Sequence, residues 1–429
     1  MSSDELALFG GTPVLTTPPE KYSSIGIDER NAVLEVIESG CLSGFYGSWE
    51  EGFLGGATVQ QFEERWSSIF GVGYTISVNS NSSGLMAAMG AVGVGPGDEV
   101  IVPPTTMSAT AMAPIIYGAI PVFADIEDQT FCLDVEAVKS KISSKTKAVI
   151  VVNLFGHPAQ LAALRAVCDE YGIALIEDNA QAICATENGQ LTGTVGDIGV
   201  FSLNYHKHIH TGEGGMCVTN NPQLAQRLRM IRNHAEAVVE AAGVDDLVNM
   251  VGFNLRMTEL SAAVGLVQLE KLDVHVSARK EFAIALSTGV SGKLGLTAPV
   301  VRENCSHSFY NWMLKYNSED TGVPRNILVD ALSAEGVPCF QGYVRPLYHL
   351  PIFQKKVAIG SEGYPFSLSD IDYSDVYCSV AERLYSEELI GIECCAWNLE
   401  GALEDRIILA FDKVYRNIDQ LRNHSKQAC

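Results

Sequence analysis

Short apolar runs alternate with amphipathic stretches between about residues 75 and 220. Seven runs are bounded by turn-forming residues: YTISVNS, DEVIVPP, AIPVFADI, KAVIVVNLF, IALIEDNA, IGVFSLN and GGMCVTNN. Several lack alternating polar positions, which is typical of strands buried on both faces of a largely parallel sheet. The pattern therefore predicts a sheet at the centre of the protein.

The segments between these runs are expected to form helices. In QLAALRAVCDEYG the spacing predicts one apolar face before Gly172, made of Leu161, Leu164, Cys168 and Tyr171. A longer helix is expected from about Thr258, its N-cap, to Leu272. Strands that alternate with helices predict an α/β fold, a three-layer α/β/α arrangement around a mostly parallel sheet. Ligands bind beyond the carboxyl ends of the strands in such sheets.

The pattern becomes looser past about residue 285, where TGVPRN and EGVP indicate turns. We read this region as a smaller α+β domain. The expected division is an N-terminal arm over residues 1–35, a large domain over 36–280 and a small C-terminal domain over 281–429.

Composition and charge limit the possible partners. The 429 residues carry a net charge of −22, which argues against a nucleic-acid partner because phosphate backbones are bound by clustered Lys and Arg. The start, MSSDELALFGG, has no basic and apolar leader, and no apolar run approaches the roughly 20 residues of a membrane span. We expect a cytoplasmic protein without a membrane partner. The eleven cysteines include no CxxC pair and suit buried thiols in a reducing compartment.

Two polar motifs follow predicted strands. Ser80-Asn81-Ser82-Ser83 stands between a strand and an expected helix, where backbone N–H groups and hydroxyls can bind an anion. Ordinary N-capping explains this motif equally well. Asp178 ends the run IALIEDNA, with Gln181 three residues later, and could hold a protonated ring nitrogen or cap a helix.

A third motif is FSLNYHKHIHTGEGG, residues 201–215. If this stretch were a strand, three histidines at positions 206, 208 and 210 would share one side, like metal ligands. A lysine in an apolar pocket can instead lose its proton and form a Schiff base with an aldehyde, and Lys207 follows Ser202 by five residues. Because the stretch continues past a strand into a loop, the three histidines need not share a side, and we expect no metal. We expect Lys207 to be the functional residue of this motif. A fourth motif, GFNLRMTE at residues 252–259, is a polar loop that leads into a helix.

The order of these motifs matters more than any one of them. A pyridoxal phosphate site needs amides and hydroxyls for the phosphate, a carboxylate for the pyridine nitrogen and a lysine for the aldehyde. An anion cradle, Asp178, Ser202 and Lys207 occur in that order at predicted strand ends. The motifs together predict a pyridoxal 5'-phosphate site.

The chain resembles the DegT/DnrJ/EryC1/StrS sugar aminotransferase family. The resemblance runs from LALFGGTPV through GVGPGDEVIVPPTT, IEDNAQAICA and GDIGVFSLNYHKHIHTGEGGMCVTNN to VGFNLRMTELSAAVGLVQLEKLD and CSVAERLYSEELIGIE. It implies the fold-type-I architecture of aspartate aminotransferase and a homodimer with shared active sites.

The resemblance also implies roles by position. Lys207 matches the Schiff-base lysine, Asp178 the carboxylate on the pyridine nitrogen and Gln181 the amide at the cofactor's 3-oxygen. The remaining cofactor contacts are implied to be phosphate ligands: Asn81, Ser82, Ser202 and, from the second subunit, Asn254. A few relatives have histidine at the lysine position and dehydrate a keto-deoxysugar, a reaction that Lys207 disfavours.

The chain departs from the family pattern at two positions. Met107 in PPTTMSAT replaces the usual aromatic residue that stacks on the pyridine ring. A thioether can fill this space, with different consequences for cofactor affinity or ring orientation. Asn153 in VVNLFG stands where a histidine is common.

The resemblance implies an aminotransferase that takes an amino group from glutamate or glutamine. The implied acceptor is a nucleotide-linked keto-deoxysugar. The chain length and the C-terminal motif also suit cyclitol ketone aminotransferases or aminohydroxybenzoate synthases. Candidate substrate contacts are His206, His208, Tyr343, Arg345 and His349.

Two other classes of protein remain as alternatives. A pyridoxal-binding protein without turnover is favoured only by Met107. A dinucleotide oxidoreductase on a doubly wound sheet would need a GxGxxG motif after its first strand, which the chain lacks.

Overall fold

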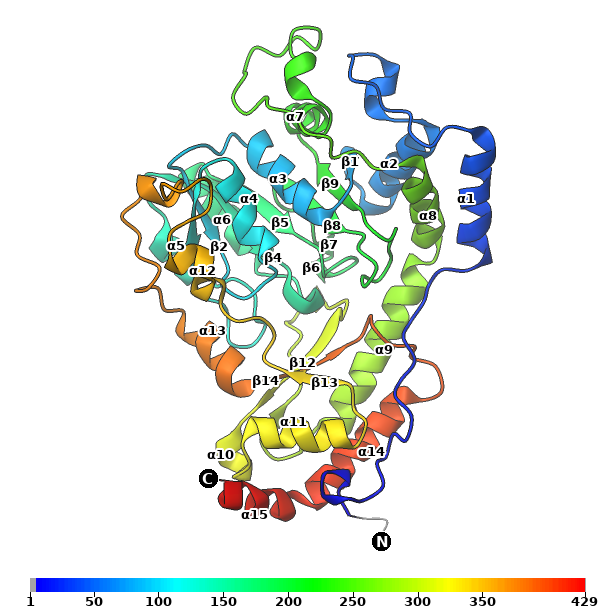
Figure 1. Cartoon of the computed structure of the whole chain (residues 1–429), viewed down its shortest axis with the longest axis vertical. Coiled ribbons are helices and arrows are strands. Elements are labelled where there is room, and N and C mark those ends of the chain that lie inside the picture. The colour runs from blue at the N-terminus through cyan, green and yellow to red at the C-terminus, as the bar shows by residue number, and fades with distance from the viewer. Residues whose placement is uncertain (1–4, 429) are drawn as a thin grey trace.

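All seven predicted strands form one sheet in the computed structural model, which describes residues 5–428 (Figure 1). Their spatial order is β1-β9-β8-β5-β4-β2-β3. The strands are β1 (Tyr74–Val78), β2 (Glu99–Val102), β3 (Ile120–Phe123), β4 (Thr146–Val152), β5 (Ala174–Asp178), β8 (Ile198–Ser202) and β9 (Gly215–Thr219). The fold is therefore α/β with a mostly parallel sheet, as the sequence predicts.

Strand β9 is the exception to the parallel arrangement. It pairs antiparallel with β1 on one side and with β8 on the other, whereas the remaining neighbours pair in parallel. Because β1 and β8 are both antiparallel to β9, β1 runs in the same direction as β8 and its parallel neighbour β5. The carboxyl ends of these three strands consequently meet at one edge of the sheet.

Both faces of the sheet are covered by apolar layers. Along β8, Val200 packs into one buried cluster and Phe201 into a different one. Cys217 and Met216 of β9 divide between the same two clusters. Because alternate residues of a strand point to opposite faces, these clusters are the two layers expected of a three-layer fold.

Fifteen α-helices surround the sheets in the described residues. They are α1 (Ile27–Ser39), α2 (Ala57–Phe70), α3 (Asn81–Ala91), α4 (Ala109–Ile116), α5 (Val135–Lys141), α6 (Leu161–Tyr171), α7 (Pro222–Arg232), α8 (Glu259–Glu270), α9 (Leu272–Val290), α10 (Ser318–Thr321), α11 (Arg325–Ala334), α12 (Pro351–Gln354), α13 (Ser379–Arg383), α14 (Leu403–Arg416) and α15 (Ile418–Ala428). No helix among residues 5–428 is long and apolar enough to span a bilayer.

The two helices predicted in detail occur where expected. Helix α6 ends at Gly172, whose φ of 65° suits a glycine after a helix. Its buried face differs by one residue, because Val167 is buried and Tyr171 is 52% exposed. Thr258 caps α8 by accepting a hydrogen bond from Ser261 N, and α9 continues the same helical run.

A smaller antiparallel sheet lies at the other end of α9 (Figure 1). Its strand order is β10 (Leu296–Thr297), β12 (Asn311–Tyr316), β14 (Leu389–Glu393) and β13 (Cys339–Gln341). Strand β12 joins two cores, since Trp312 and Leu314 pack beside the smaller sheet while Met313 packs with the large one. A third, short sheet consists of β11 (Cys305–Ser306), β6 (Thr186–Glu187) and β7 (Gln190–Leu191).

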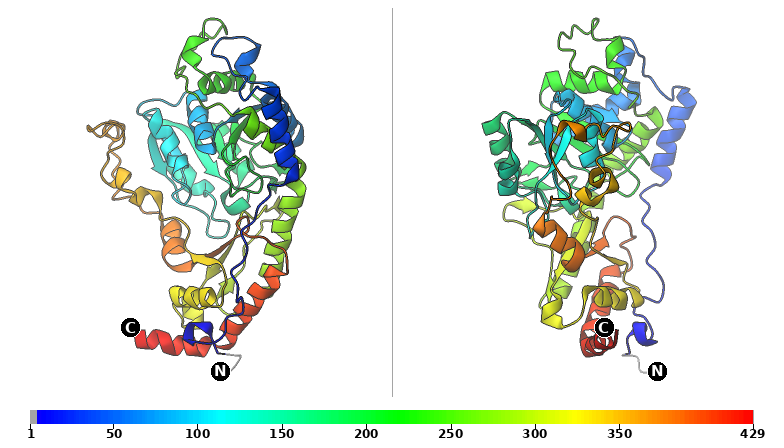
Figure 2. Two further views of the ribbon diagram at one scale, coloured as in Figure 1. Left: turned by 45° about the vertical axis from the view of Figure 1, so that its right-hand side comes forward. Right: turned by 60° about the vertical axis from the view of Figure 1, so that its left-hand side comes forward.

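The N-terminal residues run from the small sheet to the large one, beside α9 (Figure 2). Leu6 and Leu15 are buried in the small-sheet core, and Tyr22 N donates to Ala396 O over 3.0 Å. A later segment runs the other way, since Phe353 packs edge-on against Phe123 of the large sheet at 5.1 Å. The division at residues 35 and 280 stays a prediction, and these crossings show how tightly both parts are joined.

Candidate active site

The carboxyl edge of the large sheet collects three of the predicted motifs. Asp178 ends β5, Ser202 ends β8, and Ser80 follows β1 and caps α3. Lys207 lies in the loop after Ser202. These positions place a carboxylate, a hydroxyl, a helix N-terminus and a lysine around one space.

That space is a cavity of about 220 Å³. Nine of the predicted side chains line it: Asn81, Ser82, Met107, Asp178, Gln181, Ser202, His206, Lys207 and Tyr343. Residues far apart in the chain thus converge on one pocket, as the cofactor prediction requires.

Asp178 lines the cavity and has only 3% of its surface exposed. Thr110 Oγ1 donates to its Oδ2 over 2.8 Å, and Asn81 Nδ2 donates to its Oδ1 over 3.3 Å. Burial raises the pKa of this carboxyl, while these hydrogen bonds and the Lys207 charge act in the opposite direction. The carboxylate is therefore held in a dry place where a cationic ring N–H is a favourable partner.

Lys207 is a lysine without a carboxylate partner in the described part of the chain. Its Nζ lies 4.3 Å from the centre of the Tyr310 ring. Burial lowers the pKa of Lys207 from 10.5 to about 8, and the charge of Asp178 offsets part of this effect. A large fraction of this amine is then neutral near pH 8, which makes it nucleophilic.

The start of α3 forms another wall. Ser80 Oγ accepts a hydrogen bond from Ser83 N over 3.1 Å, so the capping interpretation is confirmed. The first N–H groups of a helix have no intrahelical partners and attract anions. Gly215 lets β9 approach this turn, because a Cβ there would lie 2.7 Å from the Ser80 carbonyl carbon. Capping and an anion cradle coexist here.

Gln181 is fixed in place beside the cavity. Its Oε1 accepts a hydrogen bond from Phe155 N over 2.7 Å, and its Nε2 donates to Tyr343 OH over 2.9 Å. Tyr343 also packs edge-on against Phe155 at 4.8 Å. A residue of the C-terminal region is thus coupled to the large sheet at the site.

The three histidines around Lys207 do not share one side. His206 lines the cavity, whereas His208 is 1% exposed and bonds through Nε2 to Ser308 O over 2.9 Å. His210 Nδ1 accepts a hydrogen bond from Gly212 N. His208 therefore lies outside the cavity, and the substrate contact expected for it stays a prediction. Within residues 5–428 no three His, Cys, Asp or Glu side chains are placed to hold a metal ion.

Two other expected substrate contacts also lie away from the cavity. Arg345 is exposed and does not line it. His349 Nε2 lies 2.5 Å from Oε1 of Glu382, a residue of α13. The His349 side chain therefore contacts α13 and does not line the cavity. Of this stretch only Tyr343 lines the cavity, and the substrate contacts expected for Arg345 and His349 stay predictions.

Met107 and Asn254 occupy different margins of the site. Met107 is 63% exposed at the rim of the cavity. Asn254 is exposed outside it, next to Leu255, whose carbonyl accepts a hydrogen bond from Asn79 N. Its contact with a second subunit stays a prediction. Asn153, the other unusual residue, is buried and donates to Glu177 and Asn179, so it supports the sheet.

The sequence reasoning missed Thr110, Asn204 and Tyr310. Thr110 bonds to Asp178, and Asn204 and Tyr310 line the cavity. Asn81 Oδ1 and Asn204 Oδ1 are buried without a hydrogen-bond partner in the described residues. Buried polar atoms are nearly always bonded, so these oxygens indicate that the cavity is built to hold a polar ligand.

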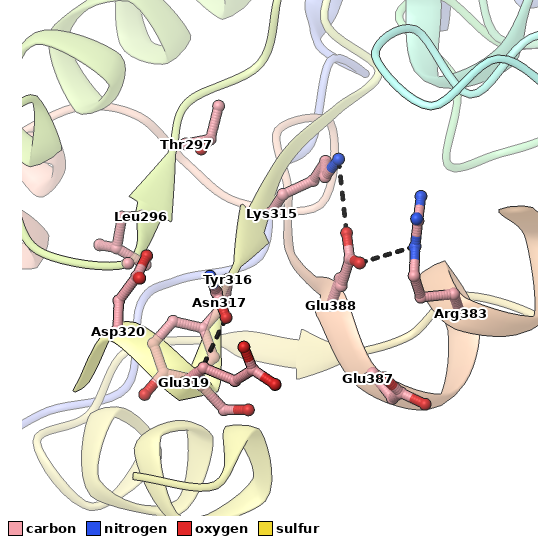
Figure 3. Close-up of a pocket in the computed structure, with 12 residues that line it drawn as sticks. Leu296, Thr297, Lys315, Tyr316, Asn317, Glu319, Asp320, Arg383, Glu387 and Glu388 are labelled. Carbon is pink, nitrogen blue, oxygen red and sulfur yellow. Dashed lines mark hydrogen bonds and ion pairs between the residues drawn. The ribbon is translucent and has the colours of Figure 1, made fainter. Parts of the chain in front are cut away.

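A larger cavity, of about 530 Å³, lies beside the small sheet (Figure 3). Its cations Lys315 and Arg383 both form ion pairs with Glu388, and both also contact Asp128. These charges neutralise one another. The smaller cavity at Lys207 is therefore the stronger candidate for chemistry.

Known proteins resemble this chain over most of its length. A model of the DegT/DnrJ/EryC1/StrS aminotransferase family matches residues 46–370. The chain is 33% identical to an L-glutamine:2-deoxy-scyllo-inosose aminotransferase of Streptoalloteichus tenebrarius, over 97% of this chain and 99% of that protein. It is 34% identical to a GDP-perosamine synthase of Caulobacter vibrioides, over 77% of this chain and 87% of that protein.

Solved structures share the fold. DesI, crystallised in the presence of its TDP-sugar product, has a TM-score of 0.81 and 25% identity, with 100% of both chains covered. An E. coli GDP-4-keto-6-deoxy-D-mannose-3-dehydratase with bound hydrated PLP has a TM-score of 0.75 and 26% identity. That match covers 92% of this chain and 99% of the dehydratase.

Proposed function

Because the chain belongs to the DegT/DnrJ/EryC1/StrS aminotransferase family, we propose that the cavity at Lys207 binds pyridoxal 5'-phosphate and carries out the amino transfer. One observation carries this proposal. Lys207 and Asp178 lie in the same buried cavity, without a direct ion pair, next to the N-terminus of α3. An amine, a carboxylate and an anion cradle are the three parts that this cofactor needs.

The residues around the cavity fit the cofactor. Asp178 would hold the ring nitrogen, and Ser82, Ser202 and the first N–H groups of α3 would hold the phosphate. Gln181 would contact the 3-oxygen, and Met107 would lie against the ring. The unpartnered Asn81 Oδ1 and Asn204 Oδ1 support this reading, because both need a polar group inside the cavity.

When bound, the cofactor supplies an aldehyde for the amino group and a ring that accepts electrons from the substrate carbon. Burial lowers the pKa of the Lys207 amine at the cavity to about 8, which suits both removal and return of a proton near neutral pH. Asp178 remains beneath the ring position and favours positive charge there. The Tyr310 ring lies beside the amine, with its centre 4.3 Å from Lys207 Nζ.

The finer identity of the acceptor is part of the proposal. The family resemblance favours a nucleotide-linked keto-deoxysugar, as the GDP- and TDP-sugar names of two related proteins suggest. A keto-cyclitol is favoured by a specific observation, since a relative that aligns with 97% of this chain is named as an inosose aminotransferase. That relative is named for L-glutamine, and we propose glutamine, with glutamate as the alternative amino donor.

The proposal includes a homodimer. Asn254 is exposed and lies outside the cavity of its own chain, so it is free to contact a second copy. In this arrangement each site is completed by the Asn254 side chain of the other subunit. Asn254→Ala should then weaken cofactor binding without changing the fold of the subunit.

A direct test uses purified protein with bound cofactor. Incubation with glutamine labelled with ¹⁵N at its α-amino group and a ketone should give a labelled amine, detected by mass spectrometry. Asn326→Leu, on an exposed position of α11, is a suitable control because it lies far from the cavity. An absence of label in any product or in the cofactor, with either donor, would overturn the proposed function.

A further inference from the structure

Asn81, the first residue of α3, lies beside the Asp178 carboxylate in the cavity at Lys207. Its Nδ2 donates a hydrogen bond to Asp178 Oδ1 over 3.3 Å. An ionised carboxylate only accepts hydrogen bonds, so the amide faces it with an N–H group. The sequence resemblance implies that Asn81 holds the phosphate, whereas the structure directs its side chain to Asp178.

Three hydrogen bonds hold the Asp178 carboxylate. Thr110 Oγ1 donates to its Oδ2 over 2.8 Å. Ala180 N and Asn81 Nδ2 each donate to its Oδ1 over 3.3 Å. The three donors come from α4, from the turn after β5 and from α3, so the carboxylate cannot rotate without breaking contacts to several elements. Asn81 is the donor that comes from the helix of the anion cradle.

The same donors favour the charged form of the carboxylate. Burial raises the pKa of Asp178, whereas the three hydrogen bonds and the charge of Lys207 lower it. The other titratable residues that line the cavity are His206, Glu213, Tyr310 and Tyr343. Loss of the Asn81 amide would therefore leave Asp178 less firmly oriented and less readily ionised.

The carbonyl end of the Asn81 amide gives a second, independent indication. Its Oδ1 is buried in the cavity wall and has no hydrogen-bond partner in the described residues. This oxygen can only accept a hydrogen bond, and a phosphate group that has lost its protons can only accept as well. A protonated ring nitrogen offers an N–H group, which suits both this oxygen and the neighbouring carboxylate.

We propose that the Asn81 side chain is a positioning residue that directs the Asp178 carboxylate to the ring nitrogen of the cofactor, and that it is not a phosphate ligand. This inference rests on the proposed function, because it needs pyridoxal 5'-phosphate in the cavity. The backbone of Asn81 lies at the anion cradle and its side chain lies at Asp178. One residue thus sets the spacing between the two places where the cofactor is held.

The test measures dissociation constants by equilibrium dialysis at one neutral pH, with the full chain freed of cofactor. Three ligands are compared: pyridoxal 5'-phosphate, pyridoxal, which lacks the phosphate, and 1-deazapyridoxal 5'-phosphate, which has carbon in place of the ring nitrogen. The variants are Asn81→Ala and Asn81→Asp, which keeps the size of the side chain and removes its N–H groups. Ser82→Ala is the matched control, because Ser82 is the next residue of α3 and is proposed to hold the phosphate.

We expect Asn81→Ala to weaken the binding of pyridoxal 5'-phosphate and of pyridoxal about tenfold, the effect of one lost hydrogen bond to a charged group. Binding of the deaza compound should change by less than about twofold, because it has no ring N–H group. Asn81→Asp should weaken the first two ligands further, since two adjacent carboxylates do not both stay ionised. Ser82→Ala should weaken only the two ligands that carry a phosphate.

Three results would overturn the assignment of Asn81 while the proposed function stands. A loss of affinity in Asn81→Ala that is confined to the two phosphate-bearing ligands would make Asn81 a phosphate ligand. An equal loss for all three ligands would indicate a general change in the cavity, and unchanged affinities would show that the side chain has no role in binding. A failure of the unmodified chain to bind pyridoxal 5'-phosphate would instead overturn the proposed function, and the assignment of Asn81 with it.

Discussion

Two cavities of this protein each contain a lysine, but the surroundings of the two amines differ. In the cavity beside the small sheet, Lys315 Nζ lies 3.4 Å from Glu388 Oε2 (Figure 3). It also lies 2.6 Å from Asp128 Oδ2. In the cavity at the large sheet, Lys207 has no carboxylate partner among the described residues and lies against the Tyr310 ring. The paired lysine lines the larger cavity, of about 530 Å³ against 220 Å³.

The surroundings of a lysine, more than the size of the cavity that it lines, decide whether the amine can react. An ion-paired cation at a partly exposed site is neutralised by its neighbours and adds modest stability. A desolvated, unpaired cation is unstable as a cation, so it releases its proton readily. The pKa of Lys207, lowered to about 8, is the expression of this difference. Four substitutions test it.

The largest effect is expected from Lys207→Ala. Loss of the amine removes the proposed attachment point of the cofactor and the proposed proton carrier, so activity should fall at least about 1000-fold. Product formation with glutamine and an acceptor ketone measures this fall. Lys315→Ala, the matched change in the other cavity, should stay within about twofold of the unmodified enzyme. Equal losses of activity in the two variants would contradict the proposed difference between Lys207 and Lys315.

Asp178→Asn should have the next largest effect. The amide keeps the shape of the side chain and removes the charge that favours a protonated ring, so activity should fall about 100-fold. The variant should still bind cofactor, with an altered absorption spectrum. Asp128→Asn serves as the control, because Asp128 pairs with Lys315 outside the active site. Full activity of Asp178→Asn would show that the charge of this carboxylate is not needed for the reaction.

Lys207→Met should stabilise the protein freed of cofactor. Between pH 8 and 10.5 the unfolded chain keeps a proton on Lys207 that the folded protein has released, so stability rises with pH across this window. At pH 7 the substitution should raise the free energy of unfolding by about 1–3 kcal/mol.

Urea unfolding at pH 7 and at pH 10 measures this gain, which should shrink at the higher pH. Lys315→Met should give no gain at either pH, because it breaks ion pairs to Asp128 and Glu388. A lower stability of Lys207→Met at pH 7 would mean that the folded protein favours the charged amine.

The smallest effect is expected at Arg383. Its side chain is 43% exposed and pairs with Asp128 and Glu388. Because exposed ion pairs contribute little, Arg383→Gln should lower the free energy of unfolding by at most about 1 kcal/mol, with activity unchanged. Thermal unfolding in low and high salt measures it. A decrease of several kcal/mol in the free energy of unfolding would show that these ion pairs contribute substantially to stability.

The sheet could be predicted because its signal is local. The seven runs that form strands are short, apolar and bounded by turn residues. Each strand can therefore be predicted from its own residues, without knowing which strands lie beside it. The antiparallel direction of β9 could not be derived in this way, since it depends on the path of the chain between Ser202 and Gly215. The burial of Val167 in place of Tyr171 is a local error at a helix end.

The centre of the site could also be predicted. Asp178, Ser202 and Lys207 lie on or next to strand ends, and strand ends of one sheet necessarily meet. The same argument identified Ser80 and its neighbours. The roles of these residues toward the cofactor stay predictions, because they rest on family resemblance and on the shape of the cavity.

The periphery of the site could not be predicted. Tyr310 and Asn311 come from β12 of the smaller sheet, and their approach to Lys207 depends on how the two sheets pack. His208 and His349 lie outside the cavity, and nearness in sequence to Lys207 or Tyr343 does not reveal where a side chain points. One side chain turns into the protein toward Ser308, and the other toward Glu382.

The most direct test of the central claim is to locate the covalent bond between protein and cofactor. The protein with bound pyridoxal 5'-phosphate is treated with borohydride, which makes this bond permanent, then digested and mapped by mass spectrometry. We expect a cofactor-modified peptide that contains Lys207 and no modification of Lys315. Modification of a different lysine, or none in a protein saturated with cofactor, would contradict the assignment of Lys207.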